Sequence, residues 1–286
     1  MMRNRPRPRV RLSASIAASL LFLAAASAQA FAGCGVSCYP GEEQIGLWPT
    51  LMADLVAQAA STSSTYYDQQ LDVAKSSAAN WSWSTTAAPT LTAAPVDGFN
   101  FPAWTFDGSA AKNIQANFTG PNGGALWPQT GDFTLVIVAD LNASTPTTGS
   151  TVYALAGSAL TSAHGWVLGI LNRQLCWIPT GGSSCTTLSS ALSTNTPHVI
   201  VFSWSSVDQL VGASVDGGAW TTSSISSSIQ SSTLTDATMS LGSSASSSYS
   251  PWWGNLFRAL LLKESLQNSA KAAQLAYLQA IFAAKY

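Results

Sequence analysis

The sequence predicts an all-β sandwich that ends in a helix and is preceded by a short helical region. From Trp104 onward, short runs of β-branched and aromatic residues alternate with clusters of Gly, Pro, Asn, Asp and Ser, which is typical of two-sheet antiparallel proteins. After Lys263 the hydrophobic residues recur with helical spacing as far as Phe282, which predicts an amphipathic helix over 264–284. Hydrophobic residues about four apart predict two short helices within 47–80.

Residues 131–140 (GDFTLVIVAD) are the clearest strand, and we expect it to be central in its sheet. Its hydrophobic residues recur with a period of two and share one face: Phe133, Leu135, Ile137 and Ala139. Further strands are predicted over 152–156, 166–171, 198–204, 210–215, 239–242 and 256–262. Residues 215–218 (VDGG) predict a hairpin turn, because Asp and Gly tolerate the positive φ that such a turn needs.

Shifts in composition predict the domain organisation. Residues 87–103 are rich in Pro, Ala and Thr, which indicates a linker, and we place a boundary near residue 95. The expected parts are a leader over 1–30, a helical N-terminal region with the linker over 31–94, and the sandwich with its C-terminal helix over 95–286. We expect this helix to pack on the sandwich edge. The Ser- and Thr-rich residues 221–250 are expected to form exposed loops around one or two edge strands.

The first 30 residues have the three parts of a secretory signal peptide. Arginines within residues 3–11 precede an apolar stretch over 12–26, and residues 28–30 (AQA) fit a cleavage site. The apolar stretch is shorter than the roughly 20 residues that a membrane-spanning helix needs. We therefore expect a secreted, periplasmic or cell-surface protein. Lipoprotein processing, which gives a lipid-anchored form, is the alternative, because residues 31–34 (FAGC) are similar to a bacterial lipobox.

The four cysteines form two local pairs, Cys34 with Cys38 and Cys176 with Cys185. An even number of cysteines suits an oxidising compartment, and we expect two short disulfides. The second pair flanks a Pro/Gly turn at 178–182, so its bridge would join the two arms of a β-hairpin. Neither spacing fits a zinc site, and the sequence predicts no metal site.

The charges narrow the range of partners. Outside the first 30 residues the chain has 7 basic and 13 acidic residues, which gives a formal net charge of −6. This charge argues against nucleic acid as a partner, and also against strongly anionic polysaccharides, which need cationic side chains. After the leader no run is apolar enough to span a bilayer, so no transmembrane segment is expected in the mature chain.

Several short motifs, taken in order, resemble the laminin-G-like, concanavalin-A-type jelly rolls of secreted bacterial proteins. They are WTFDG at 104–108, GDFTL at 131–135, PHVIV at 197–201, VDG at 215–217, LG at 241–242, WGNLFR at 253–258 and the closing helix at 276–286. The similarity covers about residues 93–286 and leaves out the helical N-terminal region. It implies a two-sheet antiparallel jelly-roll sandwich that serves carbohydrate or protein recognition and, in some relatives, glycan cleavage or calcium binding.

The carboxylates argue against a glycoside hydrolase. Glycan cleavage needs two carboxylates about 5 to 10 Å apart, and the hydrolases that the motifs resemble carry them as E-x-D-x-E, which is absent here. The three glutamates are Glu42, Glu43 and Glu264, of which the last opens the final helix. An Asp pair such as Asp107 with Asp132 is the alternative, but both residues lie in turn-like contexts at strand ends. No cluster of Asp and Asn predicts a calcium site, so we expect no cofactor.

The sequence gives little indication of a serine nucleophile or of a catalytic histidine. The sequence contains no G-x-S-x-G motif for a serine nucleophile. His164 lies before one predicted strand and His198 begins another, and a histidine at such a place could orient a ligand or act as a base. Because the sequence indicates no partner for either ring, we interpret both as hydrogen-bonded structural residues.

Tryptophan is the residue type that favours ligand binding, because its flat face stacks on sugar rings and also fills sandwich cores. Three of the 11 tryptophans lie beside Pro, Gly or Ser in predicted loops and are our predicted ligand-binding residues, with local packing as the alternative: Trp127, Trp220 and Trp252. Trp253 is expected to pack inward before the last strand. Tryptophans within predicted strands are expected in the core: Trp104, Trp166 and Trp204.

The sequence therefore predicts a secreted, non-catalytic, lectin-like protein that binds a neutral glycan or another cell-surface polymer. The alternative is a structural or adhesive surface protein that uses the sandwich for contacts with other proteins. The low charge and the Ser- and Thr-rich loops suit both, because such a surface resists non-specific electrostatic contact. The two differ in whether loop aromatics and polar side chains converge at one place, as sugar binding requires.

Overall fold

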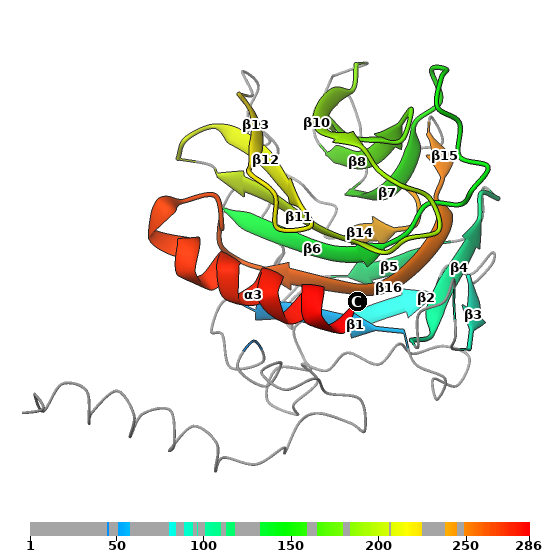
Figure 1. Cartoon of the computed structure of the whole chain (residues 1–286), viewed down its shortest axis with the longest axis horizontal. Coiled ribbons are helices and arrows are strands. Elements are labelled where there is room, and N and C mark those ends of the chain that lie inside the picture. Colours follow the sequence, from blue (N-terminus) through cyan, green and yellow to red (C-terminus); the bar gives the residue numbers. More distant parts are fainter. Residues whose placement is uncertain are drawn as a thin grey trace, which may run out of the picture.

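The computed structural model describes residues 45, 51–57, 80–83, 89–93, 96, 101–109, 113–117, 132–158, 165–179, 184–205, 207–224, 238–244 and 249–286. Two antiparallel sheets pack face to face, and one C-terminal helix lies outside them (Figure 1). The predicted all-β, two-sheet sandwich with a C-terminal helix is thereby confirmed. Within the described residues, no helix has the length and hydrophobicity to cross a membrane.

Each sheet contains eight strands. The first sheet runs in the order β13 (Thr221–Ser224), β12 (Leu210–Val215), β11 (His198–Ser205), β6 (Phe133–Ala139), β16 (Trp253–Leu262), β4 (Ala103–Asp107) and β3 (Thr90–Thr92), and β1 (Leu51–Val56) also pairs with β16. The second runs in the order β10 (Thr186–Ala191), β9 (Gln174–Pro179), β8 (Trp166–Leu171), β7 (Tyr153–Ser158), β14 (Thr238–Leu241), β5 (Ile114–Asn117) and β2 (Asn80–Trp83), with the short β15 (Ser250–Pro251) parallel to β7.

Strand β6 is central in the first sheet, as its alternating pattern predicts. Phe133, Leu135 and Ile137 lie in the core between the sheets. Val136 and Val138 belong to a second apolar cluster on the opposite face. All seven residues of β6 are buried, because the outer face of this sheet is covered as well.

A stack of aromatic rings fills the core between the sheets. The Trp166 ring lies 5.5 Å from the Phe133 ring and 5.5 Å from the Trp177 ring, measured between centroids. The Phe202 ring lies 5.0 Å from the Trp177 ring. Each ring in such a group buries a large apolar area. Trp104, Trp166 and Trp204 are buried in this core, as the sequence predicts.

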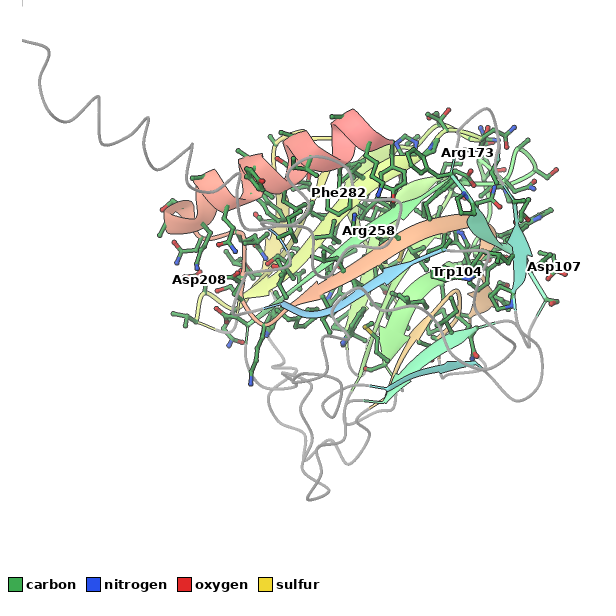
Figure 2. All side chains as sticks on the ribbon, turned by 90° about the horizontal axis from the view of Figure 1, so that it is seen from below. Trp104, Asp107, Arg173, Asp208, Arg258 and Phe282 are labelled. Carbon is green, nitrogen blue, oxygen red and sulfur yellow. A yellow bond between two sulfur atoms is a disulfide. The ribbon has the colours of Figure 1, made fainter. Side chains whose placement is uncertain are left out.

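Helix α3 (Ala272–Lys285), preceded by the 3-10 turn η2 (Ser269–Lys271), covers the outer face of the first sheet (Figure 1). Leu278 and Phe282 are buried among the outward valines of β6 and β11. The Arg258 guanidinium of β16 lies 4.7 Å from the centre of the Phe282 ring (Figure 2). The expectation that the helix packs on the sandwich edge is wrong, because the apolar outer face of this sheet is what it covers.

The predicted helices within 47–80 are wrong over Leu51–Val56. These residues form β1, which is antiparallel to β16, with Leu51 opposite Leu262. A spacing of four residues is an even number, so Leu51 and Leu55 fit the period of a strand as well as that of a helix. Ile45 is helical, whereas residues 47–50 and 58–79 lie outside the described part of the chain.

Strands β1, β2 and β3 all precede residue 95, near which the sequence analysis places a boundary. β1 pairs with β16, β2 with β5, and β3 with β4. Both sheets of the sandwich therefore include strands from the region that was expected to be helical or a linker.

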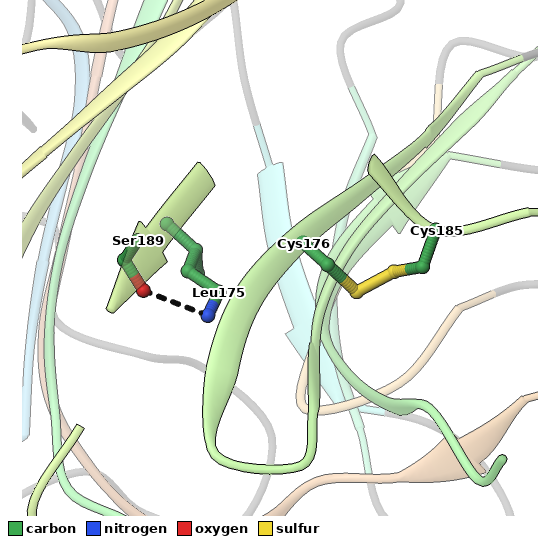
Figure 3. Close-up of a disulfide and its surroundings, with 4 residues drawn as sticks. All are labelled: Leu175, Cys176, Cys185 and Ser189. Atoms are coloured by element: carbon green, nitrogen blue, oxygen red, sulfur yellow. Dashed lines mark hydrogen bonds between the residues drawn. A yellow bond between two sulfur atoms is a disulfide. The ribbon is translucent and has the colours of Figure 1, made fainter. Parts of the chain in front are cut away.

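Two predicted local features are present in the second half of the chain. At the VDGG turn, Asp216 has a φ of 51° and Gly217 a φ of 74°, and the Gly218 N–H donates to the Val215 carbonyl at 2.8 Å. Cys176 and Cys185 form the expected disulfide between β9 and β10 (Figure 3). Cys34 and Cys38 lie outside the described residues.

Candidate functional site

The structure does not bring the three predicted ligand-binding tryptophans together. Trp252 is 0% exposed and belongs to the core between the sheets, so it is wrong as a stacking residue. Its N–H donates to the Gly242 carbonyl at 2.8 Å, and its carbonyl accepts from the Gly108 N–H at 3.0 Å, which fixes the residue with its ring inward. Trp220 is half-buried against the outer cluster of the first sheet. Trp127 lies outside the described residues.

Trp253 takes the position that was expected for Trp252. Whereas Trp252 just before it is fully buried in the core, Trp253 is the first residue of β16 and is half-buried. Its half-buried ring lies 6.3 Å from the half-buried ring of Tyr153, with 47° between the planes. A Cβ at Gly108 would lie only 3.6 Å from the Trp253 ring, so Trp253 covers the Gly108 backbone. Tyr153 packs against the core between the sheets, so Trp253 borders this core but, against the expectation that it packs inward, is only half-buried.

Polar residues at the end of β4 and in the loop after β6 lie beside Trp253. Asp107, which is exposed, lies opposite Trp253 in the pairing of β4 with β16, and its Oδ1 accepts from the Ser109 N–H at 3.0 Å. The Asn142 N–H donates to the Trp253 carbonyl at 3.1 Å. We call Tyr153, Trp253, Asp107 and Asn142 the aromatic site.

A buried carboxylate fixes the start of β16 beneath the aromatic site. Asp140 is fully buried, and its Oδ1 accepts from the Asn255 N–H at 2.8 Å while its Oδ2 accepts from the Asn255 side-chain amide at 3.1 Å. A Cβ on Gly254 would lie 2.2 Å from the Asp140 carbonyl oxygen, so only glycine permits this approach. The Thr105 hydroxyl donates to Oδ1 of the Asn255 side chain at 2.7 Å and ties β4 to the same point.

Arg173 organises the loops around the aromatic site. It occupies the turn between β8 and β9, and its Nε donates to the Thr145 carbonyl at 2.9 Å and its Nη2 to the Ala143 carbonyl at 3.2 Å. The Arg173 carbonyl accepts from the Leu192 N–H at 2.8 Å. Figure 2 shows Arg173 and Asp107 at one end of the sandwich, opposite to Asp208. The aromatic site therefore lies at the loop end that Arg173 ties together.

His198 begins β11 at the same end and is buried. Its Nδ1 lies 2.6 Å from Oδ2 of Asp216, and its Nε2 lies 2.9 Å from the Ser193 hydroxyl and 3.2 Å from the Ser193 carbonyl oxygen. Burial lowers the pKa of His198, but the hydrogen bond and charge of Asp216, the Ser193 carbonyl and the charge of Asp140 together raise it above its ordinary value. His164 lies outside the described residues.

Ser193, His198 and Asp216 have the order of contacts of a catalytic triad. A carbonyl oxygen only accepts hydrogen bonds, so its approach to Nε2 favours a proton on that nitrogen, and the Asp216 carboxylate favours one on Nδ1. A ring with both protons has no lone pair to accept the Ser193 proton. We therefore interpret the three residues as a link between chain segments.

The possible acidic pair of the sequence analysis does not form. Strands β4 and β6 both run antiparallel to β16, so they are parallel to each other. Asp132 precedes the start of β6 and Asp107 ends β4, which places the two carboxylates at opposite ends of the sandwich. Among the described residues, no group of three or more His, Cys, Asp or Glu side chains is placed to hold a metal ion.

The chain is similar to several solved structures. It matches no family model and no curated protein. It matches the botulinum neurotoxin serotype D binding domain at 12% identity and a TM-score of 0.53, over 80% of this chain and 51% of that one. The binding domain of botulinum neurotoxin DC, in a complex with rat synaptotagmin II, matches at 8% identity and a TM-score of 0.55, over 81% of this chain and 52% of that one. A Trypanosoma rangeli sialidase in complex with sialic acid matches at 15% identity and a TM-score of 0.52, over 88% of this chain and 35% of that one.

These identities establish a shared sandwich fold and no more. The chain spans about half the length of the two neurotoxin binding domains and about a third of the sialidase. Another matching structure, at 8% identity and a TM-score of 0.54, concerns the dependence of botulinum neurotoxin type C entry on two ganglioside molecules.

Proposed function

We propose that the chain binds a neutral glycan at the aromatic site and does not cleave it. The observation that carries the proposal is the half-buried Tyr153–Trp253 pair at a loop end, with the exposed Asp107 beside it. An indole or phenol face stacks on the apolar face of a sugar ring, while a carboxylate accepts hydrogen bonds from sugar hydroxyls. Ganglioside and sialic acid among the ligands of structurally similar proteins support a glycan as the ligand class.

The charges at this end favour a neutral ligand. Asp107, Asp140 and Asp216 are acidic, whereas the Arg173 guanidinium donates to two loop carbonyls and His198 contacts Asp216. An anionic sugar would need a cationic partner to offset the loss of its hydration. This argument separates the proposed ligand from the sialic acid bound by the sialidase.

The described carboxylates support binding without cleavage. Asp107 and Asp132 lie at opposite ends of the sandwich, and a glycosidase needs its pair within about 10 Å. Glu264 contacts Lys271 at 2.6 Å and accepts from the Gln274 amide at the start of the C-terminal helix, away from the aromatic site. Asp107 therefore has a role in a turn, and Glu264 has one in the packing of the C-terminal helix.

A titration with neutral oligosaccharides tests the proposal. Cellohexaose, galactohexaose and chitohexaose are titrated into the full chain by calorimetry, and the products are examined for new reducing ends. We expect binding to at least one, with no cleavage. Trp253→Ala and Tyr153→Ala should each weaken it about five- to tenfold, because an aromatic contact contributes about 1 kcal/mol.

Trp220→Ala is the matched control, because Trp220 is also half-buried but packs against the outer cluster of the first sheet. It should leave the affinity unchanged. Binding that survives both aromatic-site changes would contradict the assignment of the site. If none of the three oligosaccharides binds, the structural or adhesive function becomes the better one.

We also propose that the chain is exported. The leader supports export, and so does the Cys176–Cys185 disulfide, because disulfides persist in oxidising compartments. Mass spectrometry of the exported protein should find a chain that begins near Phe31 or Gly33, with Cys34 and Cys38 joined as a second disulfide. An intact leader or four free thiols would overturn this proposal.

A further inference from the structure

Three tripeptides of the sequence match N-x-S/T, the acceptor pattern for N-linked glycans in exported proteins. They begin at Asn80 (NWS), Asn117 (NFT) and Asn142 (NAS). Asn80 and Asn117 lie opposite each other in the pairing of β2 with β5, so both belong to paired strands of the second sheet. Asn142 differs from these two described asparagines, because it lies in the turn after β6.

The turn at 142–145 presents its tripeptide to solvent. The Thr145 N–H donates to the Asn142 carbonyl at 2.9 Å and closes the turn. Ala143 and Ser144, at the two central positions, are exposed. The Arg173 guanidinium donates to the carbonyls of Ala143 and Thr145, which holds the backbone and leaves these two central side chains outside. An enzyme can therefore reach the tripeptide without unfolding the sandwich.

The Asn142 side-chain amide is oriented with its nitrogen free. The Ser144 N–H donates to Oδ1 at 2.9 Å, and because an N–H can donate only to the oxygen of an amide, this bond fixes which end of the amide faces the turn. Within the described part of the chain, Nδ2 donates to no other group, and it is not among the buried polar atoms that lack a partner. Nδ2, the atom to which a sugar is joined, is therefore accessible.

We propose that Asn142, and not Asn80 or Asn117, is the acceptor of an N-linked glycan, which a membrane transferase of the exporting cell supplies from a lipid-linked diphosphate oligosaccharide. Nδ2 forms a bond with the anomeric carbon of the first sugar, and the bond from this carbon to the phosphate oxygen breaks. The lipid diphosphate leaves with that electron pair, and Nδ2 gives up one proton to a base of the transferase. The Ser144 hydroxyl is the group by which the transferase recognises the tripeptide.

This inference rests on the proposed export, because the modification takes place on exported chains, and it does not rest on the proposed glycan binding. The Asn142 N–H donates to the Trp253 carbonyl, so an attached glycan would begin beside the aromatic site. There it would oppose the binding of a free oligosaccharide.

Mass spectrometry of the protein that its own cells export tests the proposal. Peptides that contain Asn80, Asn117 and Asn142 are compared, and fragmentation that keeps the sugar attached locates it on one residue. We expect the added mass of a glycan on Asn142 and none on the other two asparagines. If Asn142 occurs only without sugar, or if Asn80 or Asn117 carries as much sugar as Asn142, the proposal is overturned.

Two variants of Ser144 test recognition of the tripeptide in the same cells. Ser144→Ala keeps Asn142 but removes the hydroxyl and should lose the glycan, whereas Ser144→Thr should keep it. Asn195→Gln is the matched control, because Asn195 is exposed in a loop whose N–H reaches the Leu141 carbonyl, but Pro197 stands where the pattern needs Ser or Thr. It should leave the glycan unchanged. A glycan that persists in Ser144→Ala would contradict the assignment.

Titration of the exported chain and of Ser144→Ala with cellohexaose, galactohexaose and chitohexaose keeps the two proposals apart. If Asn142 carries a glycan but neither form binds an oligosaccharide, glycan binding fails and the modification stands. If Asn142 carries no glycan and the chain binds an oligosaccharide, the modification is overturned and glycan binding stands. An intact leader on the isolated protein would refute the proposed export and the modification together.

Discussion

Trp252 and Trp253 are neighbours in the chain, and their replacement by alanine should affect the free energy of unfolding very differently. The Trp252 side chain is fully buried in the core, so Trp252→Ala removes a large group from close-packed surroundings. Truncation of a buried tryptophan costs about 3–5 kcal/mol. The half-buried Trp253 ring pairs with Tyr153, so its loss should cost nearer about 1 kcal/mol, within the range for an aromatic pair.

Urea unfolding followed by far-ultraviolet circular dichroism measures both effects, because the midpoint of the transition reports the loss of backbone structure in each variant. With equal m values, the difference in midpoint gives the difference in the free energy of unfolding. If Trp252→Ala yields no folded protein, Trp252→Phe provides a second measurement and should lie between the wild type and the expected alanine value. Equal losses for the two alanine variants, or a larger loss for Trp253→Ala, would refute the placement of Trp252 in the core and Trp253 at the loop end.

Three further changes test the packing and electrostatics of the sandwich. Because the pKa of His198 is raised in the folded chain, its contribution to stability should be complete below about pH 6.5 and disappear as the pH rises through the raised value; His198→Gln should flatten this part of a plot of Tm against pH. Gly254→Ala should destabilise the fold by about 1–3 kcal/mol or more in urea unfolding, because its Cβ would lie 2.2 Å from the Asp140 carbonyl oxygen; an unchanged midpoint would contradict this geometry. Replacing Cys176 and Cys185 together by alanine should lower the free energy of unfolding by about 2–3 kcal/mol, the entropy of a short closed loop, and a Tm equal to that of the wild type would argue against the bridge.

The central strands could be predicted, because their alternating hydrophobic residues fit a strand and do not fit a helix. In β6, Phe133 and Leu135 on one face alternate with Val136 and Val138 on the other, and no helix would separate these two sets. The early region could not be predicted in this way. The spacing of Leu51 and Leu55 fits both periods, and the pairing with β16 decides in favour of a strand.

The candidate site was harder to predict, because it depends on which of two adjacent tryptophans at the start of β16 points into the core. Trp252 lies in the single-residue gap between β15 and β16, and the sequence does not show which of the two adjacent indoles enters the core. Backbone hydrogen bonds decide this: the Trp252 N–H donates to the Gly242 carbonyl just after β14, and the Trp252 carbonyl accepts from the Gly108 N–H just after β4. The tertiary partners of a loop residue therefore determine which tryptophan remains accessible.

The contact between His198 and Asp216 left a signal in the sequence that was not used. The predicted strands 198–204 and 210–215 are separated by only five residues, and a hairpin between them places the residue that begins the first strand near the residue that follows the second. The register confirms this, because Ile200 pairs with Val215 and the next residues outward are Val199 and Asp216. The hairpin register alone therefore predicts a carboxylate beside the His198 ring.

The position of β16 in the first sheet has a consequence for the order in which the chain can fold. β16 lies between β6 and β4 and also pairs with β1, so three strands depend on a partner that is synthesised near the end of the chain. Hairpins such as β8–β9 and β11–β12 need only local sequence and can form early. A chain that stops before residue 253 would keep the hairpins but leave one edge of β6 and all of β1 without partners, open to other chains. Synthesis of β16, more than the strength of any one strand, therefore limits when this sandwich can close.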